Sequence, residues 1–311
     1  MRGSSSFFLI AAALLSASPA AGIENDLFGC RGRLAGTLER PGGAKPRVCA
    51  LIVAGSGPTD RDGNQQGMRN DSLKQLAQGL ALRGICTLRY DKRGVGGSTD
   101  AMLVERDLRF DTYIADATAW IARLRRVGGA PRVAAVGHSE GALVALLAAR
   151  HAQANAVVSI AGAGRPAAEL IREQLQQLPA VSRRRGEFIL NELVAGRLVS
   201  DVPPDFGMMF RPSVQPYLMS WTGYNPAEEI RTFSAPVMIV QGTADQQVPV
   251  GDARILAAAN PRATLSLIPD MNHVLKLSKT AEEQRAAYSD PAVPIDARVV
   301  DAIAGFLLNL P

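Results

Sequence analysis

The chain contains 311 residues, of which 47% are hydrophobic and 20% are charged, and its formal net charge at pH 7 is +5. This length is sufficient for one large domain with an insertion or for two domains, and no internal repeat or low-complexity tract is present. The positive charge is spread along the chain, and the basic triplet at residues 183–185 has no interleaved aromatic residues, so nucleic-acid binding is not expected.

The N-terminal residues 1–20 have the form of a secretory signal peptide. Arg2 precedes an apolar run at residues 7–15, and small residues suited to a signal peptidase, Ala20 among them, follow this run. The run is too short to span a bilayer, which needs about 20 residues. Cys30 lies too far downstream for a lipid anchor. The sequence therefore predicts a periplasmic or secreted protein without a membrane span after cleavage, with an uncleaved anchor as the alternative.

Beyond a short extended stretch at residues 33–41, apolar β-rich runs alternate with helical patterns. The predicted strands are 47–54, 85–91, 132–137, 156–161, 236–241 and 263–268. The predicted helices are 72–83, 110–126, 142–151, 252–260 and 296–308. Several strand runs, such as VCALIVAG, are continuously apolar, which is typical of strands buried on both faces of a parallel sheet. This order predicts an α/β fold with a doubly wound, mostly parallel sheet.

One long segment, residues 165–233, interrupts the alternation. It begins with amphipathic helical patterns and continues through the irregular run SDVPPDFGMMFRPSV. We interpret this segment as a helical lid, with residues 21–164 and 234–311 forming the α/β core.

The pentapeptide GHSEG lies directly between a predicted strand and a predicted helix. A serine at such a forced turn adopts a strained backbone conformation, which is tolerated because Gly137 and Gly141 have no side chains where strand and helix pass closely. The turn exposes the hydroxyl of Ser139 at the tip of the sheet. Ser139 is therefore the candidate nucleophile.

Serine needs a base, and the chain contains three histidines. His138 lies inside the turn and cannot fold back onto its neighbour's hydroxyl, and His151 ends the following helix. His273 follows the last predicted strand, at the edge where the carboxyl ends of the strands meet. Elimination leaves His273 as the candidate general base, the alternative being a histidine of a surface loop.

An acid is then needed to orient the imidazole. Asp245 follows the strand VMIVQG and so reaches the same edge of the sheet, whereas the preceding strand has no acid at its end. Asp270 is a competitor, but its position three residues before His273 is typical of an aspartate that caps a turn.

The remaining loops suggest an oxyanion hole and no metal site. The backbone N–H groups of Ser56, in the turn after the first core strand, and Glu140, at the start of a helix, are the expected donors. Asp60 and Asp62 resemble part of a calcium loop, but a closing glutamate is not correctly spaced, so a hydrogen-bonded turn is favoured. No metal and no organic cofactor are expected.

The three cysteines are an odd number for an exported protein. Cys49 and Cys86 lie inside apolar strands, where reduced thiols act as small core residues. The spacing of the cysteines does not decide whether Cys30 forms a disulfide with one of them.

These motifs together resemble the α/β-hydrolase superfamily, in its bacterial branch of esterases and serine-aminopeptidase-like hydrolases. The resemblance extends from about residue 33 to the end and depends on GSGPTDRDGN, RYDKRGVGGS, GHSEG, VQGTADQQVP and MNHVLK. It implies a catalytic triad of Ser139, Asp245 and His273 beneath a helical lid. One departure is that the oxyanion turn begins Ala54-Gly55 instead of His-Gly.

The predicted lid concentrates aromatic residues and methionines. Met208, Phe210, Tyr217 and Trp221 are candidates for an apolar substrate pocket, although the same residues could simply pack the lid onto the body. We expect an exported serine hydrolase that cleaves small-molecule carboxylic esters through an acyl-enzyme. The alternatives are an aminopeptidase, amidase or thioesterase with the same triad, and a non-catalytic ligand-binding protein on the same fold.

Overall fold

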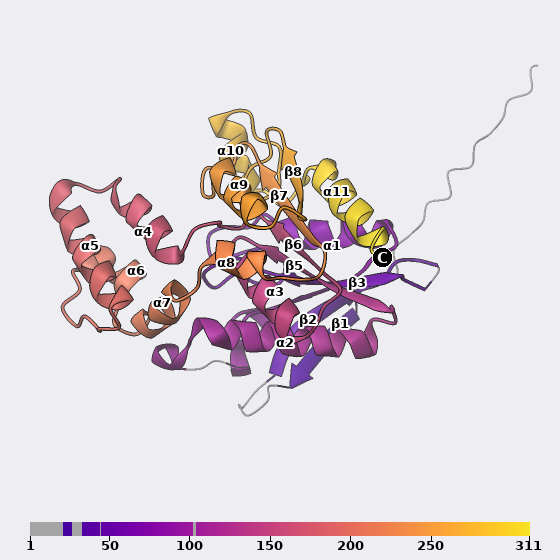
Figure 1. Ribbon diagram of the computed structural model, residues 1–311, viewed down its shortest axis with the longest axis horizontal. Coiled ribbons are helices and arrows are strands. Elements are labelled where there is room, and N and C mark those ends of the chain that lie inside the picture. The colour runs from indigo at the N-terminus through magenta and orange to yellow at the C-terminus, as the bar shows by residue number, and fades with distance from the viewer. Residues whose placement is uncertain (1–20, 27–32, 44, 102–103) are drawn as a thin grey trace, which may run out of the picture.

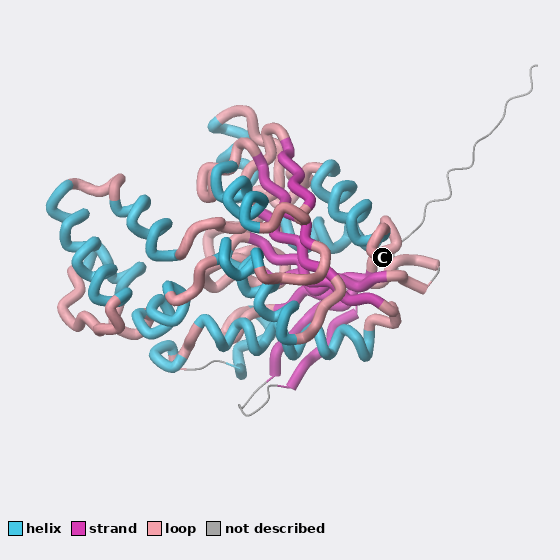
Figure 2. Tube along the Cα trace, viewed as in Figure 1, coloured by secondary structure: helices cyan, strands magenta, loops and turns pink. Residues whose placement is uncertain are grey.

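The computed structural model describes residues 21–26, 33–43, 45–101 and 104–311 (Figure 1). The predicted signal peptide and Cys30 lie outside the described residues. The described chain forms an eight-stranded sheet in the order β1-β2-β4-β3-β5-β6-β7-β8, with helices on both faces (Figure 2). Strands β3 to β8 are mutually parallel, and β2 is antiparallel to both β1 and β4. The predicted doubly wound, mostly parallel α/β sheet is confirmed.

The strands are β1 (Ala21–Asp26), β2 (Arg33–Glu39), β3 (Val48–Val53), β4 (Cys86–Tyr90), β5 (Arg132–His138), β6 (Ala156–Ile160), β7 (Val237–Gly242) and β8 (Thr264–Ile268). The core helices are α1 (Ser72–Leu82), α2 (Phe110–Val127), α3 (Glu140–His151), α9 (Val250–Ala259), α10 (Ala281–Ser289) and α11 (Ala297–Leu308). The segment at residues 165–233, hereafter the insertion, contains α4 (Ala167–Leu175), α5 (Ala180–Val194), α6 (Gly207–Phe210), α7 (Gln215–Thr222) and α8 (Pro226–Arg231). Short 3-10 helices are η1 (Gly96–Ala101), η2 (Glu105–Asp107) and η3 (Pro204–Phe206).

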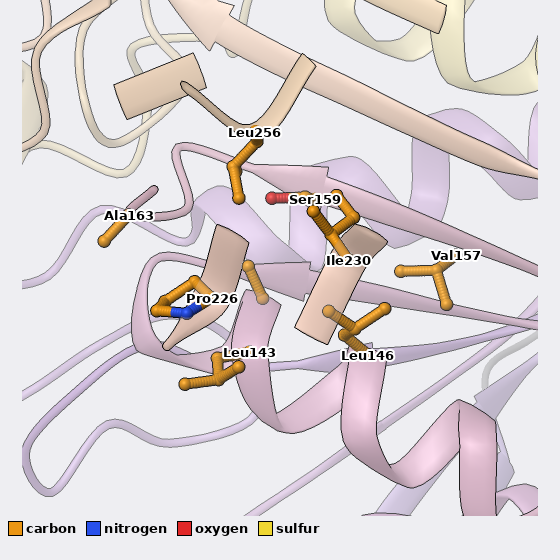
Figure 3. Close-up of a pocket in the computed structure, with 9 residues that line it drawn as sticks. Leu143, Leu146, Val157, Ser159, Ala163, Pro226, Ile230 and Leu256 are labelled. Atoms are coloured by element: carbon orange, nitrogen blue, oxygen red, sulfur yellow. The ribbon is translucent and has the colours of Figure 1, made fainter. Parts of the chain in front are cut away.

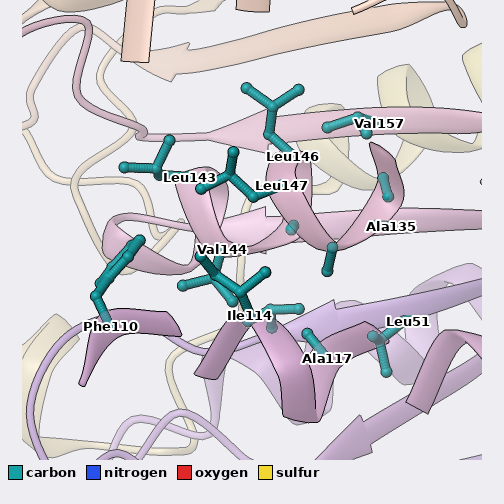
Figure 4. Close-up of a cluster of buried hydrophobic side chains, with 14 of the residues drawn as sticks. Leu51, Phe110, Ile114, Ala117, Ala135, Leu143, Val144, Leu146, Leu147 and Val157 are labelled. Atoms are coloured by element: carbon teal, nitrogen blue, oxygen red, sulfur yellow. The ribbon is translucent and has the colours of Figure 1, made fainter. Parts of the chain in front are cut away.

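Two hydrophobic layers sandwich the sheet, because successive side chains of a strand point to opposite faces. In β3 every residue is buried, and Leu51 belongs to one cluster whereas Ile52 belongs to the other. Helices α2 and α3 cover the first face, where Ala117 lies beside Leu51 and Leu147 belongs to the same cluster (Figure 4). Helices α1 and α11 cover the second face. This double burial explains why the strand sequences are continuously apolar.

Several elements differ from the sequence-based prediction. The extended stretch at residues 33–41 is the paired strand β2, and β1 was not predicted. Helix α3 begins at Glu140 instead of residue 142, so the turn before it is tighter than expected. Helix α10 was missed, although its capping box between Thr280 and Glu283 is a recognisable start signal. The last strand, β8, is an edge strand and exposes three of its five residues.

The insertion extends to one side of the sheet. Helices α4, α5 and α6 lie farthest from the strands, and α7 lies next to α2 (Figure 1). Both ends are tied to the core: Arg165 forms an ion pair with Asp252 of α9, and Arg150 of α3 pairs with Glu229 of α8. These bonds fix where the insertion leaves the core and where it returns to it.

Cys49 and Cys86 face each other on neighbouring strands. They are register partners in β3 and β4, and both are free thiols with no exposed surface. The hydrogen bond with Cys86, together with burial, raises the pKa of Cys49, so its thiol stays protonated. The prediction that both act as small core residues is confirmed.

Among the described residues, no helix is at once long enough and apolar enough to cross a bilayer.

Candidate active site

Ser139 occupies a strained turn between β5 and α3. Its backbone angles are φ 56° and ψ −126°, a region that costs a non-glycine residue about 1–3 kcal/mol. The turn closes tightly, because a Cβ at Gly137 would lie 2.1 Å from the carbonyl oxygen of Gly141. A Cβ at Gly141 would lie 2.4 Å from the carbonyl oxygen of Ala54. Both glycines are therefore required by close backbone contact, as the sequence predicted.

The turn after β3 passes directly beside this serine. Parallel pairing of β3 with β5 aligns Val53 with Gly137, so the residues that follow each strand are neighbours. A Cβ added at Gly55 would lie 3.1 Å from the Cβ of Ser139. The predicted oxyanion turn and the predicted nucleophile are therefore adjacent.

His273 and Asp245 are hydrogen bonded at the same edge of the sheet. Nδ1 of His273 lies 2.8 Å from Oδ2 of Asp245, and both residues are buried. A carboxylate can only accept, so Nδ1 carries the proton and donates it. In the neutral ring, Nε2 is then left with a lone pair that can accept a proton.

Asp245 is held as a carboxylate by several donors. Gln241 donates from Nε2 to Oδ2, and the amides of Gln247 and Val248 donate to Oδ1. Burial alone would raise the pKa of Asp245, but the hydrogen bonds from His273 and these amides together lower it below its usual value. Sequence reasoning missed Gln241, although an amide side chain inside the apolar run VMIVQG was a usable signal.

His138 connects the serine turn to the histidine loop. Its Nε2 donates to the backbone carbonyl of His273 over 2.7 Å, and the two rings lie 4.8 Å apart between centroids. The structure therefore places His273 against the residue that immediately precedes Ser139. Burial, with a smaller contribution from the neighbouring His273, lowers the pKa of His138 to about 4.

This shift makes the stability of the protein depend on pH. As pH falls from about 6.5 to about 4, the unfolded chain protonates His138 and the folded protein does not, so the free energy of unfolding falls. The loss from this residue should reach on the order of 3 kcal/mol and should level off below pH 4. Urea unfolding of the wild type and of His138→Gln across this pH range measures the difference, since other titrating groups are common to both proteins. Parallel pH curves for the two proteins would contradict the assignment.

The loop that presents His273 is organised by Asn272. Asn272 is fully buried, and its Oδ1 accepts from the amides of Val274 and Lys276. Its Nδ2 donates to Gln284 of α10, and the loop contains Leu275 at a φ of 65°. These bonds fix the backbone on both sides of His273. Asn272 was not among the site residues expected from the sequence.

The competing residues of the sequence analysis lie elsewhere. Asp270 adopts a φ of 60° in a turn and has Lys279 as its charged neighbour, 3.8 Å away. His151 ends α3 and is exposed. Asp60 accepts from the amides of Asp62 and Asn64, which confirms a hydrogen-bonded turn. No cluster of three or more potential metal ligands occurs in the described part of the chain.

The two predicted oxyanion donors lie at the start of a helix and in the turn after a strand. Glu140 is the first residue of α3, and the first N–H groups of a helix have no intrahelical acceptor. Ser56 is exposed in the turn after β3, and within the described residues its N–H makes no hydrogen bond. The Glu140 side chain is buried, which raises its pKa, while Lys92 and the hydroxyl of Tyr217 oppose that shift.

The four pocket candidates of the insertion are dispersed. Met208 is 92% exposed, whereas Phe210 is fully buried beside Phe206. Trp221 stacks on Phe110 of α2, with ring centroids 6.0 Å apart. Burial, and then the nearby negative charge of Glu140, raise the pKa of Tyr217. Of the four, the structure therefore brings only Tyr217 near the serine turn, and the aromatic contacts join α7 to α2.

A small pocket lies between α3, the end of β6, α8 and α9 (Figure 3). It is lined by apolar side chains and one hydroxyl: Ala142, Leu143, Leu146, Val157, Ser159, Ala163, Pro226, Ile230 and Leu256. None of the four predicted pocket residues belongs to this lining. The insertion contributes Pro226 and Ile230 of α8 to this pocket, while Trp221 of α7 packs on Phe110 of α2.

The geometry agrees with comparisons to known proteins. The model of a family described as the alpha/beta hydrolase family matches residues 50–282. The chain belongs to the alpha/beta hydrolase family. In this alpha/beta hydrolase, Ser139 follows β5, Asp245 follows β7 and His273 follows β8, at the carboxyl ends of parallel strands.

Individual relatives support the same family. Esterase EstD of Thermotoga maritima is 29% identical over 282 residues, covering 89% of this chain and 66% of that protein. This alpha/beta hydrolase therefore spans slightly less than two thirds of the length of EstD. The solved structure of Est1E from Butyrivibrio proteoclasticus has a TM-score of 0.60 at 17% identity and covers 93% of this chain and 98% of that chain. A thermophilic esterase from Thermogutta terrifontis has a TM-score of 0.57 at 18% identity, covering 94% and 99%. At these identities the two structures show the shared fold.

Proposed function

We propose that this alpha/beta hydrolase cleaves carboxylic esters by transferring the acyl group first to Ser139 and then to water. The main support for this proposal is the buried hydrogen bond between His273 and Asp245. This bond lies at the sheet edge, beside the strained turn of Ser139. The relatives named as esterases support the choice of substrate class.

The positions of the protons on His273 fit this reaction. His273 takes the proton of Ser139 on Nε2 while Nδ1–H remains bonded to Asp245. The Ser139 oxygen attacks the ester carbon, and the resulting imidazolium, stabilised by Asp245, gives its proton to the leaving alcohol. Water then repeats the sequence on the acyl-enzyme and regenerates the serine. The N–H groups of Ser56 and Glu140 would stabilise the negative oxygen of each tetrahedral intermediate.

Of four carboxylates of the insertion that could hold a substrate amine, Glu187, Glu192, Glu228 and Glu229, three are bonded to neighbouring side chains. An aminopeptidase needs an acidic group to hold the substrate ammonium. Glu192 is paired with Arg197, Glu229 with Arg150, and Glu187 accepts from Gln176. These three carboxylates already have partners, so they do not support an aminopeptidase site.

Export belongs to the same proposal. The basic start, the apolar run and the small residues within residues 1–20 support a cleaved leader. N-terminal sequencing of the protein from periplasm or medium should begin near residue 21, whereas a retained N-terminus in the cytoplasm would contradict export.

Labelling by a fluorophosphonate tests the proposed reaction. Such a probe phosphonylates an activated serine and releases fluoride, so the mature protein should be labelled at Ser139, as mass spectrometry of the peptide would show. A parallel panel of p-nitrophenyl esters and aminoacyl amides should give turnover of the esters. A folded protein that remains unlabelled and inert to the panel would instead favour a non-catalytic ligand-binding protein.

A further inference from the structure

A buried lysine contacts the turn that presents the oxyanion donor. Lys92 follows β4, and its side chain is almost completely buried, with 3% of the residue exposed. Its Nζ donates a hydrogen bond to the backbone carbonyl of Gly55 over 2.5 Å. The ammonium also lies 5.1 Å from the centroid of the Tyr113 ring. In the sequence, Lys92 is part of the motif RYDKRGVGGS, which by itself indicates no role for this side chain.

The contact acts on one particular peptide group. The carbonyl of Gly55 and the N–H of Ser56 belong to the same planar trans peptide, in which they point in opposite directions. Fixing the carbonyl therefore fixes the direction of the N–H. The next peptide is held as well, because the Ser56 carbonyl accepts from Thr59 and from Gln65, at 2.7 and 3.0 Å. Both peptide planes that flank Ser56 are thus restrained.

We propose that Lys92 is a positioning residue, which fixes and polarises the Gly55–Ser56 peptide so that the Ser56 N–H stabilises the oxyanion formed on Ser139. This inference rests on the proposed ester hydrolysis and names a residue that the triad does not include. A cation bonded to a carbonyl draws electron density from the peptide and makes its N–H a stronger donor. The effect is specific to the transition state, because charge develops on the substrate oxygen only there.

The surroundings of Lys92 fit a charge that acts through a peptide. Burial lowers the pKa of Lys92, while the negative charge of Glu140 opposes this shift. Glu140 immediately follows Ser139 and supplies the second proposed oxyanion amide. The lysine therefore bonds to the peptide of one proposed donor and feels the carboxylate charge of the residue that supplies the other.

The variant Lys92→Met tests this role, since methionine is similar in length but cannot donate. We expect kcat for a p-nitrophenyl ester to fall by about 10- to 100-fold with little change in KM. Affinity for an aryl boronic acid, which forms a negatively charged tetrahedral adduct with the serine, should fall by the same factor as kcat/KM. Lys92→Arg, which keeps the charge and the donors, should recover part of both losses.

Arg93→Met is the matched control for structural damage. Arg93 is the next residue of the turn and forms a buried ion pair with Asp116 of α2, with two contacts of 2.6 Å. Its loss should lower the melting temperature but leave kcat and boronate affinity per folded molecule unchanged.

The outcomes separate the two levels of inference. Equal losses of kcat/KM and boronate affinity in folded Lys92→Met, with none in Arg93→Met, support the role of Lys92. Wild-type values in folded Lys92→Met, or equal losses in both variants, overturn it while leaving ester hydrolysis intact. A wild-type protein that neither hydrolyses esters nor reacts with the fluorophosphonate overturns the proposed function, and the role of Lys92 with it.

Discussion

Replacing Ser139 by alanine should lower kcat for p-nitrophenyl esters by about 10⁶-fold. Alanine removes the oxygen that forms the acyl-enzyme, so His273 and Asp245 are left without a nucleophile to activate. The residual rate would come from oxyanion stabilisation and substrate binding alone. Stopped assays over many hours measure this rate, and fluorophosphonate labelling of Ser139→Ala should disappear.

A buried serine outside the proposed site provides the control. The hydroxyl of Ser98 bonds to the carbonyl of Asp91 and accepts from the amide of Ala35, so it supports the fold. Ser98→Ala should be less stable but should label and turn over normally when folded. Activity of Ser139→Ala within 100-fold of the wild type would show that another group is the nucleophile.

Replacing Asp245 by asparagine should lower kcat by about 10⁴-fold, the size of effect expected when the general base is held in the wrong tautomer. Four donors converge on the two carboxylate oxygens: those of Gln241, Gln247, Val248 and His273. The asparagine carbonyl would face the two backbone amides, so its NH₂ group would face His273. Nδ1 would then have to accept, Nε2 would hold the proton, and Ser139 would lose its base.

Asp270→Asn is the matched control, because it makes the same chemical change three residues from His273. Asp270 is half-exposed and has Lys279 as its charged neighbour at 3.8 Å, so its loss should change kcat by less than about 2-fold. The pH dependence of kcat for each variant, measured beside the wild type, completes the test. Asp245→Asn with wild-type kcat, or an equal loss in Asp270→Asn, would move the orienting role away from Asp245.

The sequence predicted the strands that are buried on both faces along nearly their whole length. Strands β3, β5 and β7 are enclosed on both faces, so their runs are continuously apolar and stand out without an alignment. Strand β1 was missed because AGIEND contains few residues with strong strand preference. Helix α10 was missed because its exposed, charged sequence has only one fully buried residue, Ala287.

The site was predictable where the signal was local or where few alternatives existed. The turn at Ser139 is encoded by five adjacent residues, and three histidines left one plausible base. The contacts of Lys92 with Gly55, and of His138 with the backbone of His273, join segments 37 and 135 residues apart. Such contacts depend on how loops from different strands meet, which periodicity does not report. The orientation of Met208 and Phe210 failed to follow from composition for the same reason.

Only part of the insertion is needed to connect the strands of the sheet. Strands β6 and β7 are parallel neighbours, and such strands require a crossover connection, usually a helix. Helix α8, anchored to α3 through Arg150 and Glu229, supplies that return. Helices α4 to α7 are therefore not needed to close the sheet, and doubling a loop costs only about 0.6 kcal/mol in closure entropy. Evolution or protein engineering can therefore shorten or exchange this stretch while β5, β7 and β8 keep Ser139, Asp245 and His273 in their places.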